Sequence, residues 1–137
     1  MGKIGIFVER YTMSDSEVMN ALMRISQVAY HMGHRAEFIF RPDMWKIPEF
    51  DAIYIRATTD PLNSAYVTSR TAELHGIRVI DDSESIRICC DKVNMYTYLM
   101  KAGVPIPETR FVKPIELTWK RGKELLRLIQ ETDPDAF

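Results

Sequence analysis

Apolar residues along the chain fall into short runs that alternate with longer amphipathic stretches. The runs at 3–8, 35–40, 51–56 and 77–80 are rich in β-branched and aromatic residues, which is typical of strands. Between these runs, apolar residues recur every three or four positions, as in helices with one buried face. Because strands and helices alternate, the pattern predicts an α/β fold with a mainly parallel open sheet and helices on both faces.

The first amphipathic stretch has clear helix boundaries. Ser14 and Glu17 have the S-x-x-E spacing of a capping box, and Gly33 is suited to end the helix. The apolar stripe between them consists of Val18, Leu22, Ile25, Val28, Ala29 and Met32. In the proline-containing loop at 41–50, we expect Met44 and Trp45 to cover an open edge of the core.

Three further helices are predicted before the chain turns extended. Asp60 and Pro61 favour a helix start that continues to about residue 74, and Ser83 opens a short helix after an acidic turn. Another helix begins near Asp91 and ends at Gly103, with prolines after it.

The last part of the chain has a different pattern. We expect a short strand at 109–112 and a polar helix at 114–131, which gives a first domain over 1–107 and the start of a second over 108–137. The narrow apolar stripe of that helix needs a partner surface, and pairing with a second copy in a homodimer is one hypothesis. Its members are Leu117, Leu125, Leu128 and Ile129.

Composition narrows the class of protein. The chain has 137 residues, a net charge of −1 and 46% hydrophobic residues, which is enough for one substantial core. Near neutrality gives no electrostatic argument for a nucleic acid or a membrane partner, and no apolar run is long enough for a membrane span. We therefore expect a cytoplasmic protein in which the neighbouring Cys89 and Cys90 are reduced and partly buried.

The candidate site follows from the predicted sheet. In an open parallel sheet, ligands bind beyond the carboxyl ends of the strands, which selects the loops at 9–16, 56–63 and 81–85. In the second loop, Arg56 offers a two-pronged guanidinium and Thr58 a hydroxyl group to a carboxylate or phosphate. The alternative is that Arg56 pairs with a nearby acid and that Asp60 only caps a helix.

Other candidate groups have simpler explanations. Lys92 lies in the first turn of a predicted helix, where a cation opposes the helix dipole, so it is either solvated or meets an anionic ligand. No metal site is predicted, because Gly33 separates His31 from His34 and no carboxylate pair accompanies them. No glycine-rich phosphate loop of either common type occurs in the sequence.

A series of short motifs runs through roughly residues 1–112. Its pieces are Ile55-Arg56, Asp60-Pro61, Val79-Ile80, Ser85-Ile86-Arg87, Cys89, Asp91-Lys92, Leu99 and the run Gly103 to Thr109. In this order they resemble the N-terminal part of ATP-grasp ligases. The series is similar to bacterial glutathione synthetase, with its R-x-D-P-P loop and S-L-R-x-C-N-E-K segment, and to the ligases related to the enzyme that adds glutamate to ribosomal protein S6.

The resemblance implies an enzyme that joins a carboxylate to an amine or thiol through an acyl phosphate made from ATP and Mg. It implies that Lys92 reaches the ATP phosphates, that Arg56 and Asp60 contact a small-molecule or peptide acceptor, and, more loosely, that Asp15 and Ser16 do so. The chain departs from the glutathione synthetase pattern in its longer loop after Arg56 and in a cysteine at position 90, which leaves the acceptor open.

The resemblance also implies catalytic elements that these residues do not contain. The family uses a second lysine, a flexible glycine-rich loop and acidic and asparagine ligands for magnesium, none of which is found here. We therefore expect these 137 residues to have no catalytic residues of their own, to be inert and to bind nucleotide weakly. The alternative is a non-catalytic binding module with the same fold; a receiver-like domain is a weaker hypothesis, because Arg56 stands where a receiver needs aspartate.

Overall fold

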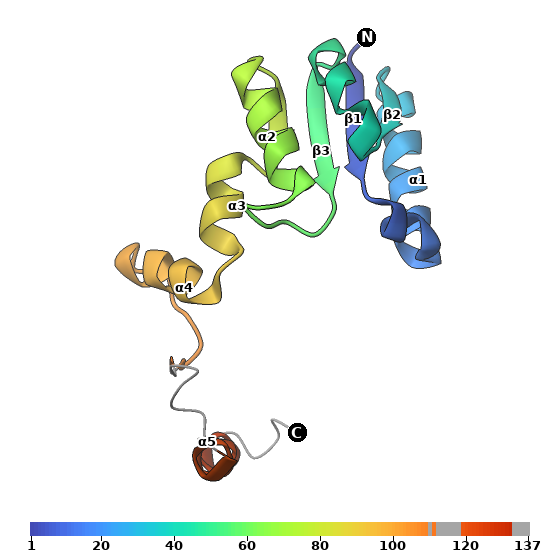
Figure 1. The fold of residues 1–137 in the computed structure, drawn as a ribbon. Helices are drawn as coiled ribbons and strands as arrows, with labels where there is room; N and C mark the ends of the chain where they lie inside the picture. The colour runs from blue at the N-terminus through green and yellow to red at the C-terminus, as the bar shows by residue number, and fades with distance from the viewer. Residues whose placement is uncertain (110, 112–118, 133–137) are drawn as a thin grey trace. The chain divides into compact units, whose positions relative to one another are not determined.

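A four-stranded parallel sheet forms the centre of the fold (Figure 1), in a computed structural model that describes residues 1–109, 111 and 119–132. Its strands are β1 (Lys3–Val8), β2 (Arg35–Ile39), β3 (Ala52–Arg56) and β4 (Arg78–Ile80), in the order β2-β1-β3-β4. All three strand pairs are parallel. The predicted fold class is confirmed, as are the four strands predicted before residue 81.

Helices cover both faces of this sheet. One face packs against α1 (Ser16–His31), where Ile6 and Val8 of β1 meet Leu22. The other face packs against α2 (Ser64–Leu74), α3 (Ser83–Cys89) and the 3-10 helix η2 (Arg41–Glu49). Its buried core consists of Phe7, Ile39, Ile47, Phe50, Ile53, Ile55, Ala65, Ala72 and Ile86. Successive β1 residues point to opposite faces, so this strand carries both cores.

Gly5 allows the central strand to be packed closely. A Cβ atom at this position would lie 2.3 Å from Cδ1 of Ile39 and 2.7 Å from Cδ1 of Ile53. The two isoleucines therefore occupy the space that a side chain at position 5 would need. This packing accounts for a glycine in the middle of a buried strand, where its weak strand propensity is otherwise unfavourable.

Several local predictions need correction. The N-cap of α1 is Asp15 and not Ser14, whose hydroxyl donates to the carbonyl of Tyr11 in the preceding 3-10 helix η1 (Arg10–Ser14). In the loop at 41–50, Met44 packs against the core as expected, but Trp45 is 70% exposed. Ile47, which the sequence did not single out, is fully buried in its place. Cys89 and Cys90 are both exposed, which contradicts the expected partial burial.

The start of α2 is also later than predicted. Asp60 does not cap this helix, because the Asn63 side chain accepts from the backbone N–H groups of Ala65 and Tyr66. Asp60 instead accepts from the N–H of Leu62 at 2.8 Å and closes a turn of its own. The helix therefore begins at Ser64, and the loop after β3 is longer than the sequence suggested.

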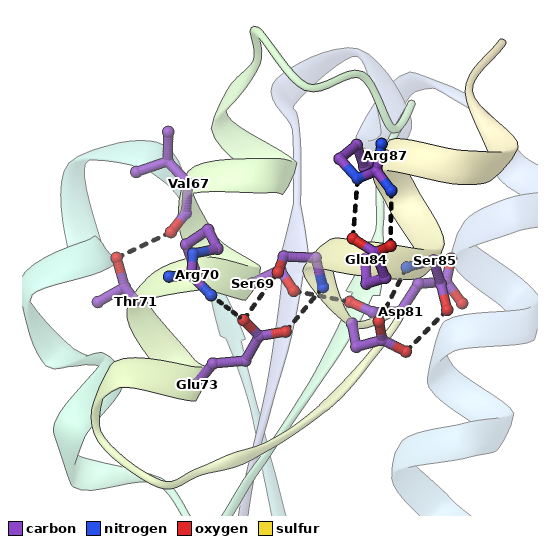
Figure 2. A network of polar contacts seen from close by, with 11 residues as sticks. Val67, Ser69, Arg70, Thr71, Glu73, Asp81, Glu84, Ser85 and Arg87 are labelled. Atoms are coloured by element: carbon purple, nitrogen blue, oxygen red, sulfur yellow. Dashed lines mark hydrogen bonds and ion pairs between the residues drawn. The ribbon is translucent and has the colours of Figure 1, made fainter. Parts of the chain in front are cut away.

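A polar network ties α2 to the turn after β4 (Figure 2). The carboxylate of Glu73 accepts from both the N–H and the hydroxyl of Ser83, each at 2.8 Å, and from Arg70 at 2.7 Å. Ser69 donates to the Asp81 carbonyl at 2.9 Å. Since Ser83 is the first residue of α3, this network fixes where that helix starts against α2.

Asp82 completes the turn as the N-cap of α3. Its carboxylate accepts from the N–H of Ser85 at 2.8 Å and from the Ser85 hydroxyl at 2.7 Å. These hydrogen bonds, the backbone one first, lower the pKa of Asp82. The acidic turn predicted at 81–82 therefore acts as a helix cap.

The chain forms two compact units, Met1–Tyr98 and Leu99–Phe137. Helix α4 (Lys92–Lys101) follows a cap in which Asp91 accepts from the N–H of Asn94, and Gly103 follows with a φ of 70°. In the second unit, α5 (Trp119–Thr132) is amphipathic, and Ile129 in its apolar stripe is 46% exposed. Most of the predicted strand at 109–112 lies outside the described residues, because residues 110 and 112 are not described. Residues 114–118 of the predicted helix, which include Leu117, also lie outside them. The homodimer and the domain boundary at 107 remain predictions.

Candidate functional site

The sheet has its topological switch point between β1 and β3. From β1 the chain passes through α1 to β2 on one side, whereas from β3 it passes through α2 to β4 on the other. The loops that follow these two neighbouring strands therefore diverge at the carboxyl edge of the sheet, which is where open parallel sheets bind ligands. A cavity of about 280 Å³ lies there, lined by Tyr11, Thr12, Asp15, Val18, Arg56, Ala57 and Thr58.

Arg56 places a positive charge at this cavity. It is the last residue of β3, it is exposed, and its guanidinium has no ion pair or hydrogen bond within the described part of the chain. The local acid proposed as an alternative partner is therefore not found there. Elsewhere in the molecule, Arg70 and Arg87 are paired with glutamates three residues away. An unpaired guanidinium beside a cavity can bind an anionic group through two parallel hydrogen bonds.

Tyr11 joins the two loops that form the cavity. Its hydroxyl accepts from the backbone N–H of Thr58 at 2.8 Å and donates to the Thr58 side-chain oxygen at 3.0 Å. Thr58 was predicted as a ligand-binding hydroxyl, and the structure shows this hydroxyl engaged with Tyr11. The contact holds the residues just after β3 against the loop after β1.

Two further contacts stabilise the same loops. The Ser64 hydroxyl donates to the carboxylate of Glu9, and the side-chain amide of Asn63 donates to the carbonyl of Thr58. Asn63 also caps α2, so the helix and the loop share one residue. The loop after β3 is therefore held at both ends while Arg56 stays unpaired.

Asp15 has a structural role in addition to lining the cavity. Its carboxylate accepts from the N–H groups of Glu17 at 3.0 Å and Val18 at 3.1 Å, which satisfies two backbone donors at the start of α1. Ser16, the next residue, is exposed and is not among the residues that line the cavity. Asp60 is not among them either, since its carboxylate closes the turn to Leu62.

Lys92 is not part of this cavity. It is the exposed first residue of α4 and is not among the residues lining the cavity. The structure therefore brings together Arg56, Thr58 and Asp15 of the predicted site residues, and leaves Ser16, Asp60 and Lys92 outside the cavity.

Sequence reasoning missed Tyr11 and the buried Thr12. Both lie within the first loop that the strand-end rule selects, so the rule located the segment but not the residues. The only signal for Tyr11 was a large aromatic residue with a hydroxyl group directly after a buried strand. Its partner lies 47 residues away, and this pairing depends on the order of the strands.

These features define a class of protein: an open parallel α/β domain with a ligand-sized cavity at its switch point. No family model matches the chain, and no curated protein matches it. Among solved structures, the chain is similar to D-alanine–D-alanine ligase from Bacillus anthracis, which was solved in complex with ATP. The TM-score is 0.53 at 15% sequence identity, and the match covers 97% of this chain and 56% of that one.

This similarity shows a shared fold. The chain spans little more than half the length of that ligase, so the activity of the larger enzyme does not transfer by alignment alone. Within the described residues, no helix is both long and apolar enough to cross a membrane.

Proposed function

We propose that this chain is the N-terminal, substrate-side domain of an ATP-grasp-type ligase, which joins a carboxylate to an amine or thiol through an acyl phosphate. The unpaired guanidinium of Arg56 at the switch-point cavity is the observation that carries the proposal. The fold shared with an ATP-dependent ligase supports it. So does the order of motifs from Arg56 to Thr109 in the sequence.

In this proposal, Arg56 binds the carboxylate of a small-molecule or peptide acceptor. The two hydrogen bonds between Tyr11 and Thr58 hold the backbone next to Arg56, so the guanidinium needs little reorganisation when the acceptor arrives. Asp15 borders the same cavity, where its carboxylate, held by two N–H groups, is a fixed acceptor for a donor group of the ligand.

The nucleotide belongs to a different part of the proposed enzyme. Lys92 would contact the ATP phosphates, and the reaction would transfer the γ-phosphoryl group to the carboxylate before the amine or thiol displaces phosphate. Transfer of a phosphoryl group requires several positioned cations, including magnesium. Because Lys92 alone cannot supply them, we infer that these 137 residues bind ATP weakly and turn over no substrate.

The acceptor site can be tested by titrating the chain with acetate, alanine and alanyl-alanine, followed by NMR. We expect carboxylate-induced shifts in residues 11–15 and 56–58, and we expect Arg56→Ala to weaken binding about tenfold. The matched control is Arg78→Ala, which removes another exposed guanidinium from the start of β4, at the opposite edge of the sheet. Equal affinities in the two variants would contradict the assignment of Arg56.

A further inference from the structure

A second cavity adjoins the first at the carboxyl edge of the sheet. It has a volume of about 380 Å³ and shares Tyr11 and Thr58 with the Arg56 cavity. Its other lining residues are Glu9, Arg41, Leu62, Asn63 and Ser64. The two cavities therefore adjoin each other at Tyr11 and Thr58.

Arg41 gives the second cavity its own positive charge. It is the exposed first residue of η2, separated from β2 by Phe40, and its guanidinium has no ion pair or hydrogen bond among the described residues. Within the described part of the chain, several other arginines are paired with glutamates, at nitrogen–oxygen distances of 2.6 to 3.0 Å. These are Arg35, Arg70, Arg87 and Arg127. Arg10, Arg24 and Arg78 also have no partner among the described residues, but Arg41 and Arg56 are the ones that line these two adjoining cavities.

We propose that the acceptor carries two carboxylate groups, one bound by Arg56 and the other by Arg41. This inference rests on the proposed function, because it describes the acceptor of the same site. Each guanidinium presents a planar pair of donors, which matches one carboxylate. The two cavities therefore bind an extended dicarboxylate or an acidic peptide with two such groups.

Glu9 and Leu62 define the ligand further. Glu9 lines the second cavity, and its only described side-chain partner is the neutral hydroxyl of Ser64. Its negative charge opposes a doubly charged phosphate more strongly than a singly charged carboxylate, so a carboxylate fits better. Leu62 is 95% exposed at this cavity, which offers an apolar contact to the methylene groups between the two carboxylates.

The test compares acids of equal length with one or two carboxylates. The chain is titrated with glutarate and pentanoate, adipate and hexanoate, and pimelate and heptanoate, and affinities are measured by NMR. We expect at least one dicarboxylate to bind about tenfold more tightly than its monocarboxylate. Arg41→Ala should remove this preference, so that each dicarboxylate binds no more tightly than its monocarboxylate. Arg24→Ala, which removes an exposed arginine from α1, should leave both affinities unchanged.

The outcomes separate this inference from the proposed function. If monocarboxylates bind through Arg56 and dicarboxylates show no preference that depends on Arg41, the inference is wrong and the acceptor site remains. If neither kind of acid binds at millimolar concentration, both are wrong. Tighter binding of 4-phosphonobutyrate than of glutarate, which has the same number of methylene groups, would overturn the choice of a second carboxylate. Circular dichroism of each variant excludes unfolding as the cause of a lost affinity.

Discussion

At the scale of single residues, Thr68 has a buried hydroxyl group without a partner. The residue is fully buried on α2, and its side-chain oxygen has no hydrogen bond within the described structure. A polar group that loses water and gains no partner costs about 1 to 3 kcal/mol. We therefore expect Thr68→Val, which keeps the shape and removes the hydroxyl, to raise the free energy of unfolding by about 1 kcal/mol.

Thr71, on the same helix, provides the control for this substitution. Its hydroxyl donates to the carbonyl of Val67 at 2.8 Å, so Thr71→Val removes a satisfied group and should not stabilise the protein. Urea unfolding followed by circular dichroism measures both variants. A loss of stability in Thr68→Val would show that its hydroxyl has a partner, such as a buried water molecule.

Glu73 makes stability depend on pH. Partial burial raises the pKa of this carboxylate, but hydrogen bonds from Ser83 and the ion pair with Arg70 lower the pKa more, so it lies below 4.5. A pKa that is lower in the folded state stabilises the protein above the unfolded value, and this contribution is lost as the pH falls through the folded pKa. We expect unfolding free energy to fall below about pH 4.5 in part because of Glu73.

Glu73→Gln tests this contribution. It removes the charge and should lower the free energy of unfolding by about 1 kcal/mol at neutral pH. The difference from wild type should shrink as the pH falls below the ordinary glutamate value, measured by urea unfolding between pH 3 and 7. Glu17→Gln, on the exposed first turn of α1, is the control. A difference that stays constant with pH would contradict the role given to the Glu73 charge.

At the scale of elements, the start of α1 has two candidate capping residues, Ser14 and Asp15. Asp15 accepts from two N–H groups, whereas the Ser14 hydroxyl points back to the Tyr11 carbonyl. We expect Asp15→Ala to lower the free energy of unfolding by about 1 kcal/mol and Ser14→Ala to lower it by less. Thermal or urea unfolding compares the two. A larger loss of stability in Ser14→Ala than in Asp15→Ala would support the capping box predicted from the sequence.

The ends of helices were predictable where the backbone conformation suits glycine and few other residues. Gly33 and Gly76 have φ values of 80° and 70°, which other residues rarely adopt, so the helix ends followed directly from the sequence. Helix starts were less certain, because several capping residues stand close together. Each of the residues Ser14, Asp15 and Ser16 has a side chain that can cap a helix. The preceding 3-10 helix η1 engages the Ser14 hydroxyl, which leaves Asp15 as the cap of α1.

The loop at 41–50 shows a second limit of sequence reasoning. It contains two prolines, which suggested an irregular segment, but it forms the 3-10 helix η2. A 3-10 helix has three residues per turn, and in η2 this repeat turns Ile47, and not Trp45, toward the core. Apolar residues alone could not show this, because the direction of each side chain depends on the period of the backbone.

At the scale of the whole molecule, the position of the site was predictable and its construction was not. The rule for parallel sheets selected the loops after β1, β3 and β4, and Arg56, Thr58 and Asp15 all line the cavity between the first two. No residue of the third loop, 81–85, lines this cavity. The contact between Tyr11 and Thr58, and the second cavity with Arg41, depend on which strands are neighbours. A single sequence does not give that order, because β2 precedes β3 in the chain but lies on the other side of β1.

Lys92 does not line the cavity that contains Arg56, and this leads to the last prediction. If Arg56 binds the acceptor and Lys92 contacts phosphate, the two ligands should bind independently to this chain. Calorimetry with Mg-ATP should show weak binding that Lys92→Ala reduces by about 1.5 kcal/mol, the value of one charged hydrogen bond. Arg56→Ala should leave Mg-ATP binding unchanged.

Lys101→Ala is the matched control, since it removes a lysine from the last turn of the same helix. An equal effect of both lysine variants would mean that ATP responds only to the general charge of α4. No heat at millimolar ATP would contradict the assignment of Lys92 to phosphate binding in this chain. Carboxylate binding by Arg56 would still stand in that case, because the cavity at the switch point does not include Lys92.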